Sequence, residues 1–129
     1  MIVVDSSALT AVLAGAVPNP RLVARIAVED SIHATDLLDI EFLGSLRGLL
    51  RGGKISEERT RQARFLFAEL QVVRYPVAVI TDRVWALRHN LSAYDASYVA
   101  LAEALGCPLI TTDNRIATAS GHVAQVEAF

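Results

Sequence analysis

The sequence predicts an α/β protein in which a central parallel sheet of short strands is covered by helices on both faces. Short apolar segments alternate along the chain with longer segments of helical periodicity. These apolar segments are continuous rather than alternately apolar and polar, which is typical of strands buried on both faces. We find no internal repeat, low-complexity tract or linker in the 129 residues, so we expect one domain over residues 1–129.

Each element has a local signal in the sequence. The expected strands are short and apolar and cover residues 2–5, 31–34, 72–75, 108–112 and 122–126. The expected helices follow them and cover residues 8–14, 21–29, 36–51, 57–70, 76–89, 93–105 and a short segment after Asp113. This alternation of strand and helix favours parallel pairing of the strands.

Capping residues and helix breakers define the helix ends. Side chains that can cap a helix N-terminus stand at the expected starts, namely Ser6 or Ser7, Thr35 or Asp36, Ser56, and Ser92. Pro18 and Pro20 separate the first two helices, because proline cannot continue a helix. Gly52-Gly53 ends the long third helix, and Gly106 ends the helix that follows Ser92.

Two of the helices carry a clear apolar stripe. The stripe of the third helix is Leu38, Phe42, Leu46 and Leu49, and that of the helix after Ser92 is Tyr94, Tyr98, Leu101 and Leu105. Residues at this spacing share one face of a helix, so we expect both stripes to pack into the core.

Composition and charge narrow the class of protein. Hydrophobic residues make up 53% of the chain and the mean hydropathy is +0.38, which argues against disorder. No apolar run approaches the roughly 18 residues that span a bilayer. The N-terminal segment has no basic region and carries Asp5, so we expect a soluble, cytoplasmic protein. The single cysteine, Cys107, cannot form an internal disulfide, and we expect it to be buried.

Basic residues concentrate in one segment of the chain. Six of the twelve Lys and Arg residues are Arg47, Arg51, Lys54, Arg59, Arg61 and Arg64. The net charge of -2 argues against a general polyanion binder. The segment is therefore either a solvated helical hairpin of mixed charge or a patch that binds an RNA backbone or a protein partner.

Four carboxylates stand where a functional site can form. Asp5 and Asp113 follow expected strands, Asp95 lies in the first turn of a helix, and Glu41 shares its helix face with small residues that leave space beside it. In parallel sheets, functional groups gather at the strand C-termini where the strand order reverses. Asp5 and Asp113 therefore converge if the first and fourth strands are neighbours. Each acid alone has an ordinary structural explanation at a helix start, in a turn or on a helix surface.

A cluster of these acids would need a cation. Two carboxylates about 5 Å apart repel by roughly 3 kcal/mol at an effective dielectric constant of about 20. Only Arg115 lies close to one of the four acids in the sequence. We expect Mg²⁺ or Mn²⁺, which prefer carboxylate oxygens. The three histidines are isolated, so no spacing indicates zinc, and we expect them to be structural or exposed. A metal held by acids supports phosphodiester hydrolysis, because it activates water and stabilises charge on the phosphoryl group.

With these residues in place, the sequence resembles the PIN-domain ribonucleases, and within them the VapC-type toxins of bacterial toxin–antitoxin pairs. The resemblance covers nearly the whole chain, and all four acids stand in matching local settings. It is carried by Ile2-Val-Val-Asp-Ser-Ser-Ala-Leu9, Asp36-Leu-Leu-Asp-Ile-Glu41 with Leu46-Arg47, Leu91-Ser-Ala-Tyr-Asp-Ala-Ser-Tyr-Val-Ala-Leu-Ala102, and Leu109-Ile-Thr-Thr-Asp113.

The resemblance implies a three-layer α/β/α fold and an Mg²⁺- or Mn²⁺-dependent endoribonuclease that acts as a toxin on RNA. The residues that match the family's catalytic and metal-binding acids are Asp5, Glu41, Asp95 and Asp113. Supporting polar positions beside them are matched by Ser6, Thr112 and Asn114. The family further implies a cognate VapB-type antitoxin whose tail occupies the site, and a homodimer.

Other classes of function are weaker matches to the sequence. A phosphoryl-accepting receiver domain needs a lysine at a strand end, whereas the only lysine, Lys54, follows a helix. A phosphatase of the Asp-x-Asp type would need an acid where Ser7 stands. The remaining alternative is a non-catalytic PIN-like module that binds RNA or protein. It predicts no change of melting temperature with Mg²⁺, because only a ligand of the native state stabilises the fold.

Overall fold

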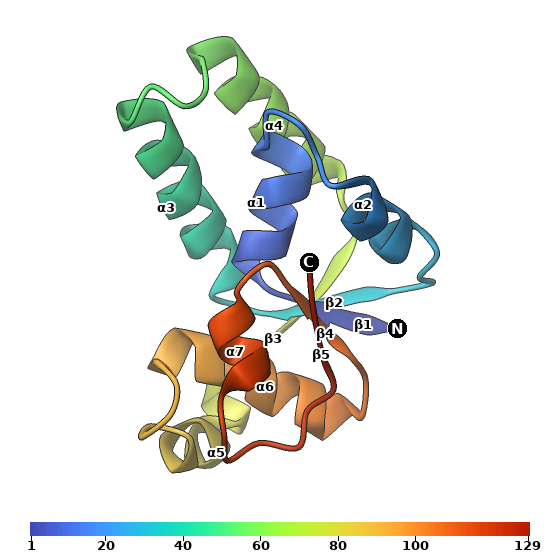
Figure 1. The fold of residues 1–129 in the computed structure, drawn as a ribbon, viewed down its shortest axis with the longest axis vertical. Coiled ribbons are helices and arrows are strands. Elements are labelled where there is room, and N and C mark those ends of the chain that lie inside the picture. The colour runs from blue at the N-terminus through green and yellow to red at the C-terminus, as the bar shows by residue number, and fades with distance from the viewer.

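The computed structural model describes residues 1–129 and contains one sheet of five strands (Figure 1). The strands are β1 (Ile2–Val4), β2 (Ile32–Thr35), β3 (Val72–Tyr75), β4 (Leu109–Thr111) and β5 (Val126–Ala128). Their order across the sheet is β3-β2-β1-β4-β5, and every neighbouring pair is parallel. The predicted fold class, a parallel sheet of short strands, is confirmed.

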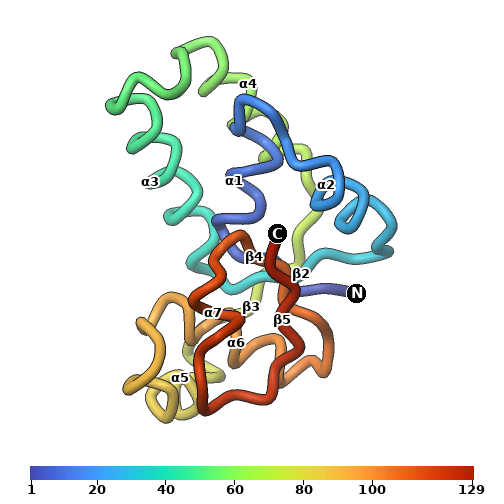
Figure 2. Tube along the Cα trace, in the orientation of Figure 1, coloured from blue at the N-terminus to red at the C-terminus, as the bar shows by residue number.

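Helices cover the two faces of this sheet. They are α1 (Ser6–Ala14), α2 (Pro20–Ala27), α3 (Leu38–Arg51), α4 (Glu57–Glu69), the 3₁₀ helix η1 (Val77–Val79), α5 (Thr81–Ala86), α6 (Ala93–Leu105) and α7 (Asn114–Thr118). Figure 1 shows α1 to α4 on one side of the sheet and α5 and α6 on the other, which makes the three layers. The trace in Figure 2 shows that α3 and α4 form a hairpin extending away from the sheet, and α1 packs against both helices.

The strand order reverses between β1 and β4. From β1 the chain passes to β2 and β3 on one side of the sheet, and it later returns to β4 and β5 on the other side. The backbones of β1 and β4 are in register at Val3 with Leu109 and at Val4 with Ile110. The predicted adjacency of the first and fourth strands is therefore confirmed, and the residues that follow these strands lie at the same edge of the sheet.

The core lies mainly between this sheet and the helices beside it. All three residues of β1 and of β4 are buried, as expected for central strands of a parallel sheet. In α6, every residue from Ala96 to Ala102 is buried, because this part of the helix packs against β1, β2 and β4. Cys107 is buried and unpaired, as predicted.

The predicted stripe of α6 is wrong at its first position. Tyr98 and Leu101 are 2% exposed, whereas Tyr94 is 57% exposed. Tyr94 stands in the first turn of the helix, ahead of the buried block that begins at Ala96. The helical spacing is correct, but the apolar surface that receives the stripe does not reach the helix N-terminus.

Some predicted helix starts need correction. Asp5 itself caps α1, and Ser6 and Ser7 are the first two residues of that helix. The residue before α3 is Leu37, which makes no capping hydrogen bond. Asp36 instead accepts a hydrogen bond from the backbone N–H of Val77, at 3.2 Å, and so joins the end of β2 to the segment after β3.

Other boundaries are confirmed or shifted. Ser56 and Ser92 cap α4 and α6 as predicted, and α6 ends at Gly106 in the left-handed region, with φ of +62°. The last strand occupies residues 126–128 rather than 122–126, because its pairing partner β4 ends at Thr111 and sets the register with Ala128. Helical structure after Pro76 ends at Ala86 and is interrupted after η1, so it does not reach His89 as predicted.

His33 is the one buried histidine and has a structural role. Its ring nitrogens lie 3.0 Å from Tyr75 Oη and 2.9 Å from Ser31 Oγ. It therefore links β2 to β3, which fits the structural role predicted for the histidines. None of the helices is long and apolar enough to cross a membrane.

Candidate active site

Asp5 is the most buried of the four predicted acids, with 5% of its surface exposed. It stands directly after β1 and caps α1, where its Oδ1 accepts a hydrogen bond of 2.9 Å from the backbone N–H of Ala8. A carboxylate in this position accepts a hydrogen bond from a backbone N–H that would otherwise be unpaired at the helix N-terminus. Its negative charge is also favoured by the helix dipole. The Asp5 carboxylate therefore lies at the edge of the sheet, directly after a buried strand.

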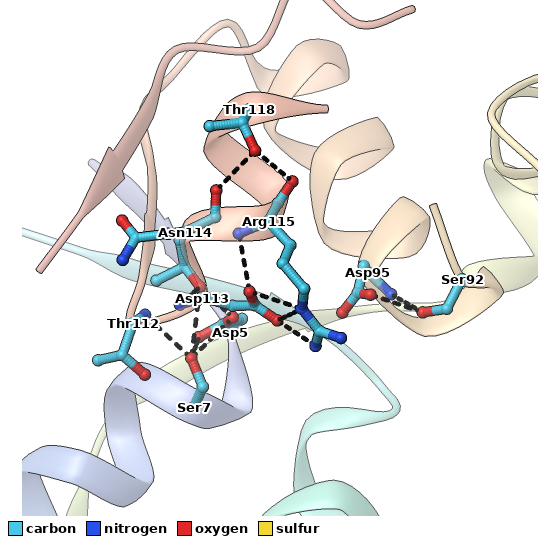
Figure 3. Close-up of polar contacts among 10 residues, drawn as sticks. Asp5, Ser7, Ser92, Asp95, Thr112, Asp113, Asn114, Arg115 and Thr118 are labelled. Carbon is cyan, nitrogen blue, oxygen red and sulfur yellow. Dashed lines mark hydrogen bonds and ion pairs between the residues drawn. The ribbon is translucent and has the colours of Figure 1, made fainter. Parts of the chain in front are cut away.

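Two hydroxyl groups hold the Asp5 carboxylate, and Figure 3 shows one of them, that of Ser7. Ser7 Oγ lies 2.8 and 3.0 Å from the two carboxylate oxygens, and Thr111 Oγ1 donates to Oδ2 at 2.6 Å. The same hydroxyls accept hydrogen bonds from the backbone N–H groups of Thr112, at 3.0 Å, and Asp113, at 2.9 Å. The end of β4 is therefore attached to Asp5 by side chains as well as by the sheet.

These two hydroxyls are one position away from the predicted ones. The resemblance assigns Ser6 and Thr112 a possible role in positioning metal-bound water or phosphate, and that role stays a prediction. The hydroxyls in contact with Asp5 belong to Ser7 and Thr111. Thr112 contributes its backbone N–H instead. In Figure 3 the side chain of Asn114, the third predicted supporting residue, points away from the carboxylates.

Asp95 stands in the first turn of α6 and is partly exposed. Ser92 Oγ donates to its Oδ2 at 2.7 Å and accepts from its backbone N–H at 3.1 Å, which is the reciprocal capping pattern predicted from the sequence. The pKa of Asp5 is raised mainly by burial, and the charge of Asp95 raises it further. The two carboxylates therefore lie within each other's electrostatic field.

Glu41 reaches the same region from α3. Tyr98 Oη donates a hydrogen bond of 2.5 Å to its Oε2, and Tyr98 lies one helical turn after Asp95 on α6. Burial is the main reason that the pKa of Glu41 is raised; the Tyr98 hydrogen bond opposes this, and the charges of Asp5 and Asp95 add to it. Asp5, Glu41 and Asp95 are thus electrostatically coupled, although their elements are far apart in the sequence.

Asp113 has a different environment from the other acids. It caps α7 and accepts from the backbone N–H of Arg115 at 2.8 Å. The Arg115 side chain also donates to both of its oxygens, from Nε at 3.0 and 3.1 Å and from Nη2 at 2.5 Å. These hydrogen bonds to Arg115 lower the pKa of Asp113. Asp113 is therefore neutralised within the chain, whereas Asp5 and Glu41 have no cationic partner.

The donor atoms of the site fit a hard divalent cation. Carboxylate and hydroxyl oxygens are the ligands that Mg²⁺ and Mn²⁺ prefer. Burial raises the pKa of both Asp5 and Glu41, and neither carboxylate has a cationic partner within the chain. No group of three or more His, Cys, Asp or Glu side chains is drawn together closely enough to hold a metal ion. Binding by Asp113 would require its release from Arg115.

A groove of about 790 Å³ between α1 and α3 adjoins these residues. Small side chains of both helices line it, together with Ser7 and, at the far end of α3, Lys54. Four basic side chains of the α3–α4 hairpin are exposed and form no ion pair, namely Arg47, Arg51, Lys54 and Arg64. Arg61 pairs with Glu58 of its own helix at 3.0 Å. The α3–α4 hairpin thus presents unneutralised positive charge, and one of these side chains, Lys54, lines the same groove as Ser7, which contacts Asp5.

The chain is similar to known proteins over most of its length. The family model described as PIN domain matches residues 2–121. Ribonuclease VapC9 from Mycobacterium tuberculosis is 43% identical over 116 residues, which are 90% of this chain and 88% of that protein. Ribonuclease VapC12 from the same species is 37% identical over 127 residues, or 98% of each chain. The crystal structure of VapBC2 from Rickettsia felis, bound to a DNA fragment from their promoter, aligns with a TM-score of 0.70 at 12% identity and covers 100% of this chain and 99% of that one.

The burial of Asp5 predicts a cost in stability. Its raised pKa means that the folded state binds a proton more tightly than the unfolded state, so this group lowers the free energy of unfolding as the pH rises through the raised pKa. Without divalent cations, Asp5→Asn should therefore raise the melting temperature at neutral pH by a few degrees. This gain should shrink as the pH falls through the pKa of Asp5, because protonation of the wild-type carboxyl removes the same charge.

Thermal unfolding followed by circular dichroism at several pH values measures this effect. Asp82→Asn is the matched control, since Asp82 is an exposed acid in the first turn of α5, and it should leave the melting temperature unchanged. A lower melting temperature for Asp5→Asn at neutral pH would show that the hydrogen bonds of Asp5 outweigh its desolvation.

Proposed function

Because this chain belongs to the PIN-domain family and is related over most of its length to VapC ribonucleases, we propose that it is a metal-dependent endoribonuclease and the toxin of a toxin–antitoxin pair. One observation supports this more than any other. A buried aspartate at the switch point of a parallel sheet is held by hydroxyls from two elements and lies in the electrostatic field of Glu41 and Asp95.

In this proposal Asp5, Asp95 and Asp113 hold Mg²⁺ or Mn²⁺, with Glu41 completing the site. When bound, the ion would supply the positive charge that stabilises the phosphoryl group and lowers the pKa of a water. Ser7 and Thr111 fix the Asp5 carboxylate in one orientation, so that it need not reorganise when a ligand arrives. A carboxylate fixed in this way is a better ligand than one that must first be ordered.

Glu41 is the group best placed to take a proton from the attacking water. Tyr98 occupies its Oε2, which leaves Oε1 as the free acceptor. The raised pKa of Glu41 brings its basicity closer to that needed at neutral pH. Burial beside α6 also limits the motion of the side chain. Asp5, Asp95 and Asp113 are then the ligand set, and Glu41 holds the proton during hydrolysis of the RNA phosphodiester.

The proposed partner is a VapB-type antitoxin. The structural relative from Rickettsia felis is a VapBC complex, and the groove between α1 and α3 leads toward the Asp5 hydroxyl network. A bound antitoxin segment at this position would cover the site without any change in the fold. We also infer a homodimer, as the family resemblance implies.

Substitution of one metal ligand tests the catalytic proposal. Asp95→Asn keeps the side-chain shape but removes the charge, so metal-dependent RNA cleavage should fall about 100-fold or more. Asp82→Asn again provides the matched first-turn control and should keep full activity. Cleavage is measured on RNA with and without Mn²⁺, and circular dichroism checks the fold. Full activity of Asp95→Asn would refute the assignment. A chain that binds RNA but never cleaves it would instead be the non-catalytic module.

The hydrogen bond from Tyr98 to Glu41 predicts a shift in the pH profile. This bond stabilises the charged form of Glu41, so its removal by Tyr98→Phe should raise the pKa of Glu41 further. Activity that needs ionised Glu41 is lost as the pH falls through this pKa. The acid limb of the pH–rate profile should therefore move to higher pH in Tyr98→Phe.

Tyr94→Phe is the matched control for this experiment, because it removes a hydroxyl from an exposed tyrosine of the same helix. Its acid limb should coincide with that of the wild type, whatever its overall rate. An unchanged limb in Tyr98→Phe would mean that Glu41 is not the proton acceptor.

The partner proposal predicts that a gene for a small VapB-type protein lies beside the gene for this chain, and co-expression of the two proteins tests it. The two should co-purify, the complex should not cleave RNA, and the free chain should elute as a dimer in size-exclusion chromatography. A monomeric chain that is not bound or inhibited by the neighbouring protein would contradict both partner proposals.

A further inference from the structure

Arg115 is the only basic side chain that pairs with any of the four acids. Its side chain is 87% exposed, yet it is held in a bidentate arrangement on Asp113, with Nε 3.0 and 3.1 Å from the two oxygens and Nη2 2.5 Å from one of them. An exposed ion pair adds little to stability, because water screens it and the long side chain loses freedom. The geometry therefore needs an explanation other than support of the fold.

The position of the guanidinium relates it to the whole site. In Figure 3 it lies between the carboxylate of Asp113 and the first turn of α6, which carries Asp95. The charge of Asp95 acts on Arg115 together with the hydrogen bonds to Asp113. Asp5 and Glu41, deeper in the site, have no such partner. Arg115 thus supplies positive charge at the exposed side of an otherwise uncompensated cluster.

The hydrogen bonds of Asp113 conflict with a role as metal ligand. Its Oδ1 accepts from the backbone N–H and from Nε of Arg115, and its Oδ2 accepts from Nε and Nη2. A cation that takes a lone pair from Asp113 must compete with the guanidinium for it. An exposed pair is readily broken, so this competition weakens cation binding without preventing it.

We propose that Arg115 is an exchangeable counter-ion of the site, which neutralises Asp113 until a divalent cation binds and then turns to a phosphate of the RNA. This inference rests on the proposed ribonuclease function. The released guanidinium remains next to the acids on a flexible stem at the solvent-facing side of α7. Its planar N–H groups match two phosphate oxygens as well as they match two carboxylate oxygens.

The proposal predicts opposite effects of one substitution on two ligands. Arg115→Ala removes the competitor, so Mn²⁺ should bind about two- to fivefold more tightly. The same change removes a phosphate contact, so KM for RNA should rise about tenfold, with a smaller change in kcat. Arg115→Lys keeps the positive charge but loses the planar guanidinium group, so its KM should lie between those of the wild type and Arg115→Ala.

Isothermal titration with Mn²⁺ alone measures the first effect, and steady-state cleavage of RNA in saturating Mn²⁺ measures the second. Arg61→Ala is the control for metal binding, because Arg61 forms an exposed intrahelical pair of the same kind with Glu58. Its Mn²⁺ affinity should equal that of the wild type. In an Asp113→Asn background, Arg115→Ala should no longer strengthen Mn²⁺ binding, because Arg115 competes with the cation only by binding the Asp113 carboxylate.

Unchanged or weaker Mn²⁺ binding by Arg115→Ala would overturn the counter-ion role, and an unchanged KM would overturn the phosphate role. Both results leave the ribonuclease proposal intact if the wild-type chain binds Mn²⁺ and cleaves RNA. A wild-type chain that does neither would overturn the proposed function and this inference together, so the two failures are distinguishable.

Discussion

The site depends on the parallel pairing of β1 with β4. This pairing places Asp5 beside Thr111, 106 positions later in the chain, and the hydroxyl of Thr111 then bonds to both the Asp5 carboxylate and the backbone of Asp113. Ser7 makes a second bridge of the same kind to Thr112. The two hydroxyls hydrogen-bond to the Asp5 carboxylate and accept hydrogen bonds from two backbone N–H groups. Because all these polar groups are paired, the charged Asp5 side chain is tolerated at the edge of a buried sheet.

The arrangement favours ligand binding over stability. Burial raises the pKa of both Asp5 and Glu41, and the charge of Asp95 raises both further. The protein keeps these groups in position with neutral donors, namely Ser7, Thr111 and Tyr98, which orient the carboxylates without neutralising them. A bound divalent cation would neutralise the negative charge that remains on these carboxylates. Carboxylates with pKa values perturbed in this way are common at functional sites.

Much of this architecture could be predicted from the sequence, because continuous apolar strands and strong helix caps are local signals. The acids Asp5 and Asp113 were placed correctly at strand ends for the same reason. The hydroxyls that hold Asp5 were not identified from the sequence, because side chains alternate along a strand and only the register reveals which of Thr111 and Thr112 faces Asp5. The contact of Tyr98 with Glu41 joins residues 57 positions apart, and no local pattern encodes it.

The long sequence separation within the Asp5 network has a consequence for synthesis of the protein. A ribosome makes Asp5 106 positions before it makes Thr111, the residue of β4 whose hydroxyl holds the Asp5 carboxylate. Until β4 inserts beside β1, the sheet lacks a central strand and Asp5 lacks its hydroxyl partner. An incomplete nascent chain therefore cannot assemble the site. The complete Asp5 network can form only after β4 has been synthesised and has paired with β1.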